Sequence, residues 1–385
     1  MVLRNKKTFI ILFDILGRIT FFIPLVLERI SRKTCLIPEK ILILELWGIG
    51  DLVMMSPILQ PLRENFPQAK IILLSKQAGK DIFGQSSYFD DYIVFDFPWT
   101  KFSEKYKIWE WDWKSIINII RQLKKEKFEL ILDARGDIRN NLVSYLIGGK
   151  RRLGYDWMGG GYFLTDKINF NIESSHRSEG WYKLLEHLKL KIENPKTDIP
   201  VSTEIESQSK NFLKVSGLNE NDLIIGIHPG ASVKVRCWSL EKFAKVAEYL
   251  KDTYKAKTVI FIDSEGYGEG INLRSEWIKA KVDLNMLIGI IKNLDLLICN
   301  DSGAMHIATA VGTPVVAVFG PGDAKTIGPY GGIHRLVQIR DLNCRPCFDR
   351  CKYDRMRCLE SIRVEDVAKA ADEVIADILK ERITR

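Results

Sequence analysis

The chain has 385 residues, which is long for one hydrophobic core and enough for two domains of about 150 to 190 residues each. Hydrophobic residues make up 46% and charged residues 28%, a balance that indicates a globular protein and excludes a low-complexity or fibrous chain. The net charge of +8 favours an anionic partner, and seven cysteines without a cleavable signal pattern indicate a reducing, cytoplasmic compartment.

The N-terminal segment, residues 1–38, contains an apolar run almost long enough to span a bilayer, but Asp14, Arg18 and Pro24 interrupt it. On a helical wheel its polar residues fall on one side, and its first 33 residues hold seven basic against two acidic side chains. We therefore predict a helix that lies in the membrane interface against anionic head groups. An ordinary helix packed on the first domain is the alternative.

Residues 39–205 alternate short apolar strands with helical patterns, which predicts a first Rossmann-like domain. A helix is expected over residues 52–65, running through Pro57. Four tryptophans lie between the third and fourth strands; they are more often packing residues, although an exposed subset could stack on acceptor sugars. The expected strands are 41–46, 70–74, 92–96 and 129–133.

The loop after the first strand, residues 47–51, contains Gly48-x-Gly50 and ends in Asp51. Val53 stands where the third glycine of a dinucleotide fingerprint belongs, which disfavours a nicotinamide-dependent oxidoreductase. Asp51 places a carboxylate at the start of a helix, where it either caps the helix or serves chemistry.

Residues 206–385 are expected to form a second Rossmann-like domain, reached through a polar passage over 192–222 that contains two prolines. The expected strands are 223–228, 258–263, 296–299 and 315–319, and the expected helices are 240–254, 304–311 and 364–380.

The strongest local signal lies in residues 297–322. A buried strand is followed by the turn Asn300-Asp301-Ser302-Gly303, which supplies N-cap chemistry to the next helix. The N–H groups of the first helical turn and the positive end of the helix dipole favour a bound anion, and glycine lets the backbone come close to it. The turn therefore predicts an anion site at the edge of a parallel sheet.

The motif Asp301-Ser302-Gly303-x-x-His306, followed by Ala-x-x-x-Gly-Thr-Pro and Phe-Gly-Pro, resembles the nucleotide-sugar site of the family 9 glycosyltransferases, the heptosyltransferases of the lipopolysaccharide inner core. The resemblance covers residues 40–385. It implies an α/β chain of GT-B architecture, two Rossmann-like domains facing each other across a cleft, with the N-terminal apolar helix in addition. It also implies inverting, metal-independent transfer of a heptose from ADP-heptose to a lipopolysaccharide core acceptor, with no cofactor and no nucleic-acid partner.

The same resemblance implies roles for individual residues. Gly48, Gly50 and Asp51 match the family's first glycine loop, whose aspartate is the catalytic base. Arg236 stands where the family has a lysine facing the donor phosphates, and Lys234 is nearby, so either could make that contact. The expected donor-binding residues are Ser232, Lys234, Arg236, Asp301, Ser302, Gly303 and His306, although a packed core residue is the alternative for the histidine.

Three groups of residues are left with open alternatives. Arg135, Arg139 and Arg152 lie in segments that resemble the acceptor side and suit anionic sugars, or are solvated surface charges. Glu265 or Glu269 could bind the donor ribose. A third group, Cys344, Cys347, Cys351 and Cys358, could close a structural zinc or cluster site, although the resemblance implies no metal in catalysis.

The sequence thus predicts a cytoplasmic glycosyltransferase, peripheral on the inner face of the inner membrane, that acts on a lipid-anchored glycan. A non-catalytic, membrane-bound sugar-nucleotide-binding protein is one alternative, because it would keep the donor site without needing Asp51. A related transferase that uses another nucleotide sugar is the other.

Overall fold

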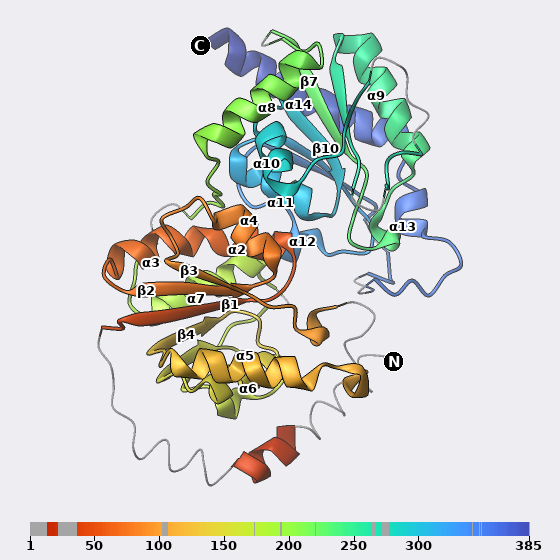
Figure 1. Cartoon of the computed structure of the whole chain (residues 1–385). Coiled ribbons are helices and arrows are strands. Elements are labelled where there is room, and N and C mark those ends of the chain that lie inside the picture. Colours follow the sequence, from red (N-terminus) through yellow and green to blue (C-terminus); the bar gives the residue numbers. More distant parts are fainter. Residues whose placement is uncertain are drawn as a thin grey trace. The chain divides into compact units, whose positions relative to one another are not determined.

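The structure is a computed structural model, and it divides the chain into two compact units. The first comprises the residues up to 172 together with 178–195, and the second comprises 173–177 together with 196–385 (Figure 1). The described residues are 14–21, 37–101, 107–172, 174–192, 195–219, 221–263, 266–270, 277–340, 342–345, 347 and 349–384.

The first unit is built on a six-stranded parallel sheet with the strand order β3-β2-β1-β4-β5-β6 (Figure 1). The inner strands are buried on both faces, which explains their continuous apolar runs. The order reverses between β1 and β4, so the loops after these two strands diverge and leave room for a ligand. The strands are β1 (Lys40–Glu45), β2 (Lys70–Ser75), β3 (Asp91–Val94), β4 (Leu130–Asp133), β5 (Arg151–Gly154) and β6 (Asp166–Lys167).

Helices cover both faces of this sheet. One face carries α2 (Ile49–Met55), α3 (Leu59–Asn65) and α4 (Gln77–Phe83), and the other carries α5 (Trp113–Lys125) and α6 (Ile138–Ile147) (Figure 1). Ile116, Ile119 and Leu123 of α5 pack into the core against β1 and β2. A further helix, α7 (Arg177–His187), follows β6.

The helix expected over residues 52–65 begins earlier and is broken in the middle. It starts as α2 at Ile49, and a 3-10 turn, Ser56–Ile58, separates α2 from α3. Pro57 has no N–H to donate to the carbonyl of Val53, and its ring crowds that carbonyl. The Val53 carbonyl instead accepts hydrogen bonds from the backbone N–H and the Oγ of Ser56, the latter at 2.7 Å.

The second unit repeats the same topology, with the strand order β12-β11-β10-β7-β8-β9 and all pairs parallel. Its order reverses between β7 and β10. The strands are β7 (Ile224–His228), β8 (Lys257–Phe261), β9 (Ile278–Ala280), β10 (Leu296–Asn300), β11 (Val315–Phe319) and β12 (His334–Gln338).

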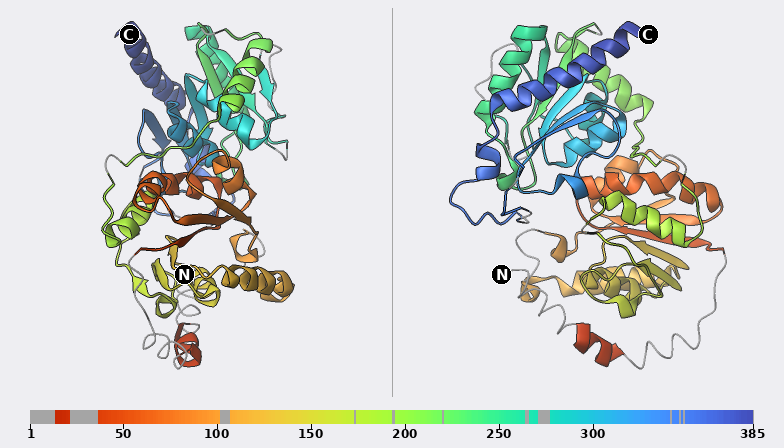
Figure 2. Two further views of the ribbon diagram at one scale, coloured as in Figure 1. Left: turned by 60° about the vertical axis from the view of Figure 1, so that its left-hand side comes forward. Right: turned by 180° about the vertical axis from the view of Figure 1, so that it is seen from behind.

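One face of the second sheet is covered by α9 (Leu240–Tyr254) and α14 (Val364–Thr384), which share one hydrophobic core (Figure 2). The other face carries α8 (Thr203–Val215), α10 (Leu284–Lys292) and α11 (Gly303–Val311). Two short helices, α12 (Ala324–Ile327) and α13 (Arg357–Glu360), lie in the connections near β11 and before α14. The polar passage expected over 192–222 therefore contains a 13-residue helix, α8, which the structure packs against α10.

Only part of the N-terminal segment is described. Residues 14–21 are helical, whereas 1–13 and 22–36 lie outside the described residues. Within the described part of the chain, no helix has the length and apolar character needed to cross a bilayer.

Candidate active site

The first candidate site lies where the order of the first sheet reverses. Asp51 stands on the first turn of α2, after β1, and its Oδ1 accepts a hydrogen bond from Nη1 of Arg135, which follows β4, at 3.1 Å. Its Oδ2 faces the N–H of Gly48 at 3.4 Å. The two side chains are 22% and 24% exposed, so this reversal point presents a carboxylate and a guanidinium that solvent and ligands can reach.

The surrounding loops hold Arg135 in place. Its guanidinium carbon lies 4.0 Å from the centroid of the Trp47 ring, which adds a cation–π interaction to the ion pair with Asp51. Its backbone N–H donates to Oδ1 of Asp133 at 2.8 Å. Gly48 is the residue that precedes α2, whereas Gly50 lies inside the helix and not in the loop where the sequence placed it.

Two buried carboxyl groups, those of Glu45 and Asp133, lie near this pair. Burial raises the pKa of Glu45 well above its ordinary value, the negative charge of Asp51 raises it further, and the charge of Arg135 opposes both. Burial likewise raises the pKa of Asp133 to about 7. Both groups are therefore shifted toward their neutral forms, which leaves Asp51 as the accessible carboxylate beside Arg135.

The expected acceptor-side arginines have different surroundings. Arg139 donates from Nε and Nη2 to the two oxygens of Asp137, at 2.8 and 2.6 Å. Arg152 is only 2% exposed, and its guanidinium donates to the carbonyls of Phe163 and Gly149, each at 2.7 Å. The structure therefore speaks against an acceptor role for Arg152, because its donors are engaged with backbone in the interior.

The tryptophan-rich stretch divides into buried and exposed members. Trp99 is buried, and its Nε1 donates to Oδ1 of Asn140 at 3.1 Å. Trp109 and Trp113 are exposed. Stacking on an acceptor sugar stays a prediction that now concerns these two residues.

The second candidate site lies where the order of the second sheet reverses. Asn300, at the end of β10, is fully buried and bonds the loop that follows β7. Its Oδ1 accepts from the N–H of Trp238 at 3.0 Å, and its Nδ2 donates to the carbonyl of Pro229 at 2.6 Å. The side chain of Asn300 thus connects the loop after β7, which carries Arg236, to the turn that starts α11.

The turn itself differs from the expected side-chain cap. Ser302 precedes α11 in an extended conformation, but its side chain makes no capping hydrogen bond. Its Oγ is buried, and no hydrogen-bond partner for it occurs among the residues that the structure describes. The helix start at Gly303 is therefore not closed by its own N-cap side chain, and His306 lies buried one turn further along.

Arg236 lies between two carboxylates at this turn. Its Nε and Nη2 donate to the two oxygens of Asp349, each at 2.7 Å, and its Nη1 lies 3.4 Å from Oδ2 of Asp301. Burial raises the pKa of Asp301 to about 6, and the charge of Arg236 opposes that shift. Ser232 and Lys234 are exposed on the same loop, so of the two expected cations the structure holds the arginine at the turn.

Two residues of these sites were not expected from the sequence. Glu45 could have been identified from the sequence, because it is the one charged residue in the apolar run of 41–46. No sequence pattern marks Asp349 as a partner of Arg236, because the two residues lie 113 positions apart.

The remaining predictions concern ribose and metal binding. Glu269 is exposed and pairs with Lys281 at 3.2 Å, and Glu265 lies outside the described residues. The four cysteines expected as possible ligands line one small cavity as free thiols. Among the described residues, no group of three or more histidine, cysteine or acidic side chains is placed to hold a metal ion.

Comparison with known proteins gives one consistent family. Residues 116–357 match the model of glycosyltransferase family 9 (heptosyltransferase). The lipopolysaccharide core heptosyltransferase OpsX of Haemophilus influenzae is 24% identical over 330 residues, which are 81% of this chain and 88% of that protein.

Solved structures agree with that match. The glycosyl transferase family 9 protein of Veillonella parvula aligns with a TM-score of 0.72 and 24% identity, covering 89% of this chain and 98% of that one. The ADP-heptose lps heptosyltransferase II of E. coli aligns with a TM-score of 0.68 and 19% identity, covering 89% and 99%. The GT-B fold expected from the sequence is thereby confirmed.

Proposed function

The chain belongs to glycosyltransferase family 9, the heptosyltransferases, and on that premise we propose that it transfers a heptose from ADP-heptose to a lipopolysaccharide core acceptor with inversion. The observation that carries the proposal is Asp51, an accessible carboxylate at a sheet reversal point, oriented by Arg135 at 3.1 Å. An enzyme needs such a base for the acceptor hydroxyl, whereas a protein that only binds nucleotide sugars does not.

In the proposed reaction the acceptor oxygen attacks the anomeric carbon of the heptose as the bond from that carbon to the diphosphate breaks. Asp51 takes the proton from the acceptor hydroxyl, and ADP leaves with the bonding electrons. A single displacement of this kind inverts the configuration at the carbon that is attacked.

The leaving diphosphate requires positive charge and hydrogen-bond donors. Arg236 and the backbone N–H groups at the start of α11 supply both, next to the buried Oγ of Ser302. We propose that these groups stabilise the charge that develops on ADP and that the reaction needs no divalent ion.

Titration calorimetry with ADP and with NAD, followed by a transfer assay with ADP-heptose and truncated lipopolysaccharide acceptors, tests this proposal. We expect ADP to bind, NAD not to bind, and heptose to be transferred with inversion. Binding without turnover, together with an Asp51→Asn variant that behaves as the wild type, would establish the non-catalytic alternative. A panel of other nucleotide sugars tests the remaining alternative, a transferase with a different donor.

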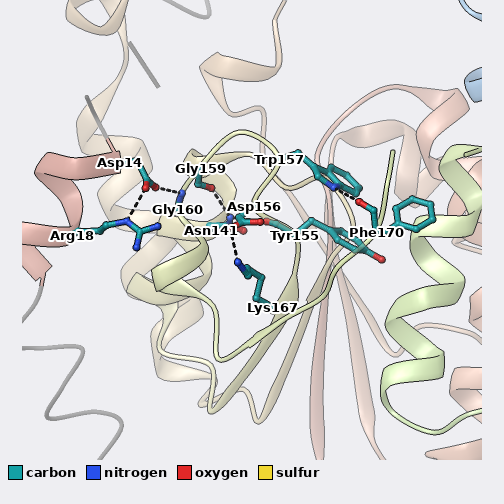
Figure 3. Close-up of polar contacts among 10 residues, drawn as sticks. All are labelled: Asp14, Arg18, Asn141, Tyr155, Asp156, Trp157, Gly159, Gly160, Lys167 and Phe170. Atoms are coloured by element: carbon teal, nitrogen blue, oxygen red, sulfur yellow. Dashed lines mark hydrogen bonds and ion pairs between the residues drawn. The ribbon is translucent and has the colours of Figure 1, made fainter. Parts of the chain in front are cut away.

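We further propose that the enzyme is peripheral on the anionic inner face of the inner membrane, attached through its N-terminal segment. The helix of residues 14–21 contacts the first unit through the side that carries Asp14 and Phe21. Figure 3 shows the contact of Asp14. Asp14 accepts a hydrogen bond from the N–H of Gly160 at 2.7 Å and pairs with Arg18 at 2.8 Å. The ring of Phe21 packs edge-on against Phe163 at 5.1 Å.

Three other apolar side chains of the same helix face solvent. Ile15, Leu16 and Ile19 are 49%, 53% and 70% exposed. A helix that is merely packed on a domain buries most of its large apolar side chains. Together with the basic excess of the first 33 residues, this orientation favours contact with an anionic bilayer.

Flotation with liposomes tests the attachment. The double variant Leu16→Asp and Ile19→Asp removes apolar contact worth about 0.8 kcal/mol per buried methylene and adds negative charge, so we expect loss of binding to anionic liposomes. Transfer to a soluble acceptor fragment should be unchanged. Val215→Asp, at a residue that is 75% exposed in the second unit, is the matched control and should float as the wild type does. Undiminished flotation of the double variant would contradict the proposed attachment.

A further inference from the structure

One ion pair joins the loop after β7 to the cysteine-rich segment after β12. Arg236 and Asp349 form a two-pronged contact in which Nε and Nη2 each donate at 2.7 Å. The side chains are 20% and 15% exposed, so most of the pair is withdrawn from water. A two-pronged contact fixes the plane and the rotation of a guanidinium as well as its position.

This contact decides where the third guanidinium nitrogen lies. Nη1 is 3.4 Å from Asp301, which directly precedes Ser302 and the start of α11. Arginine otherwise has many rotamers, and a ligand that binds a mobile arginine must order it first. Asp349 imposes that order on Arg236 before any anion binds.

Asp349 is itself held by its surroundings. Its φ of +61° lies in the left-handed region, which aspartate tolerates better than most side chains. Arg345 ties the same segment to the end of β11, because its Nε donates to the carbonyl of Gly320 at 3.0 Å. The N–H of Arg350 closes a turn on the carbonyl of Cys347 at 3.1 Å. A rare backbone conformation that the neighbouring contacts maintain is typical of a functional position.

We propose that Asp349 positions Arg236 for the diphosphate of the donor, an inference that rests on the proposed function of this turn. Asp349 acts through the arginine and not on the reacting atoms. A carboxylate in this place could instead compete with the diphosphate for the same guanidinium. The two roles predict opposite signs, since removing a competitor tightens ADP binding and removing a positioning group weakens it.

Calorimetry with ADP on the full-length protein measures that sign. We expect Asp349→Ala to weaken ADP binding about tenfold and to raise the KM for the donor more than it lowers kcat. Asp349→Asn should recover part of the affinity, because asparagine tolerates the left-handed backbone and keeps one acceptor oxygen. Asp354→Ala, at an exposed position of the same segment, is the matched control and should bind as the wild type does.

A double-mutant cycle separates positioning from a general structural effect. In an Arg236→Ala background, Asp349→Ala should cause no further loss of ADP affinity, because no guanidinium remains to be oriented. Unchanged or tighter ADP binding by Asp349→Ala and Asp349→Asn, or full additivity in the cycle, would overturn the inference. Absence of ADP binding by the wild type would overturn the proposed function itself.

Discussion

The order of the first sheet reverses between β1 and β4, and the order of the second reverses between β7 and β10, so each sheet opens a pair of loops at the same topological position. The side chains placed there differ. The first reversal point gathers carboxyl groups around one arginine, with Asp51 accessible and Glu45 and Asp133 buried. The second also sets an arginine, Arg236, between two carboxyl groups, Asp301 and Asp349, but places it beside the start of a nine-residue helix.

The comparison shows that the shared topology determines where a ligand can bind in each unit. A few side chains at that position determine the chemistry. Burial acts in the same direction at both points, because it raises the pKa of Asp133 to about 7 and that of Asp301 to about 6. What differs is the carboxyl group that each arginine contacts. Arg236 lies 3.4 Å from the buried Asp301, whereas Arg135 pairs with the accessible Asp51.

The largest effect is expected from a substitution at the reversal point of the first sheet. Asp51→Asn should lower kcat by about a hundredfold or more, because an amide cannot take the proton of the acceptor hydroxyl. ADP affinity should be unchanged, since the proposed donor groups belong to the other unit. Steady-state kinetics with calorimetry measures both, with Asp91→Asn, an exposed aspartate of the same unit, as the control. Turnover close to that of the wild type would remove Asp51 from the mechanism.

The next largest effect is expected at the reversal point of the second sheet. Arg236→Ala should weaken donor binding and slow transfer together, by about 10- to 100-fold, because one cation stabilises both the bound diphosphate and the charge that develops on it. Lys234→Ala should have a smaller effect, since Lys234 is exposed on the loop. Arg236→Lys tests whether charge alone suffices without the planar fork. A larger loss in Lys234→Ala than in Arg236→Ala would show that the lysine faces the phosphates.

The sequence predicts the parts of both units that local patterns determine. Continuous apolar runs identify the inner strands, and glycine with small polar residues identifies the turn at Ser302 and Gly303. The start of α11 differs from the expectation by one residue. These signals are readable because each depends on neighbours in the chain.

The parts that were not predicted depend on contacts between distant segments. Arg152 reads as a surface cation, but β5 directs it inward, where the carbonyls of Phe163 and Gly149 accept its donors. The contact of Arg236 with Asp349 likewise requires the fold to bring together residues 113 positions apart. Ser302 is a residue type that can cap a helix, but in the structure its side chain makes no capping hydrogen bond.

The last prediction concerns stability and tests whether the first reversal point is built over neutral carboxyl groups. Burial holds the pKa of Asp133 at about 7 in the folded protein, against about 3.9 in an unfolded chain. Between these values the folded state binds more protons than the unfolded state. The contribution of Asp133 to stability is therefore complete below about pH 4, falls as the pH rises toward 7, and levels off above it.

Denaturant unfolding from pH 5 to pH 8 measures this contribution. In Asp133→Asn the group no longer titrates, so the free energy of unfolding of the variant relative to the wild type should rise with pH up to about pH 7, by on the order of 1 kcal/mol per pH unit. Glu45 gives a slope of the same sign in both proteins. Glu64→Gln, at an exposed position of the same unit, should show no such rise. A pH-independent difference between Asp133→Asn and the wild type would mean that Asp133 is already ionised at pH 5, and that Arg135 then balances two carboxylates instead of one.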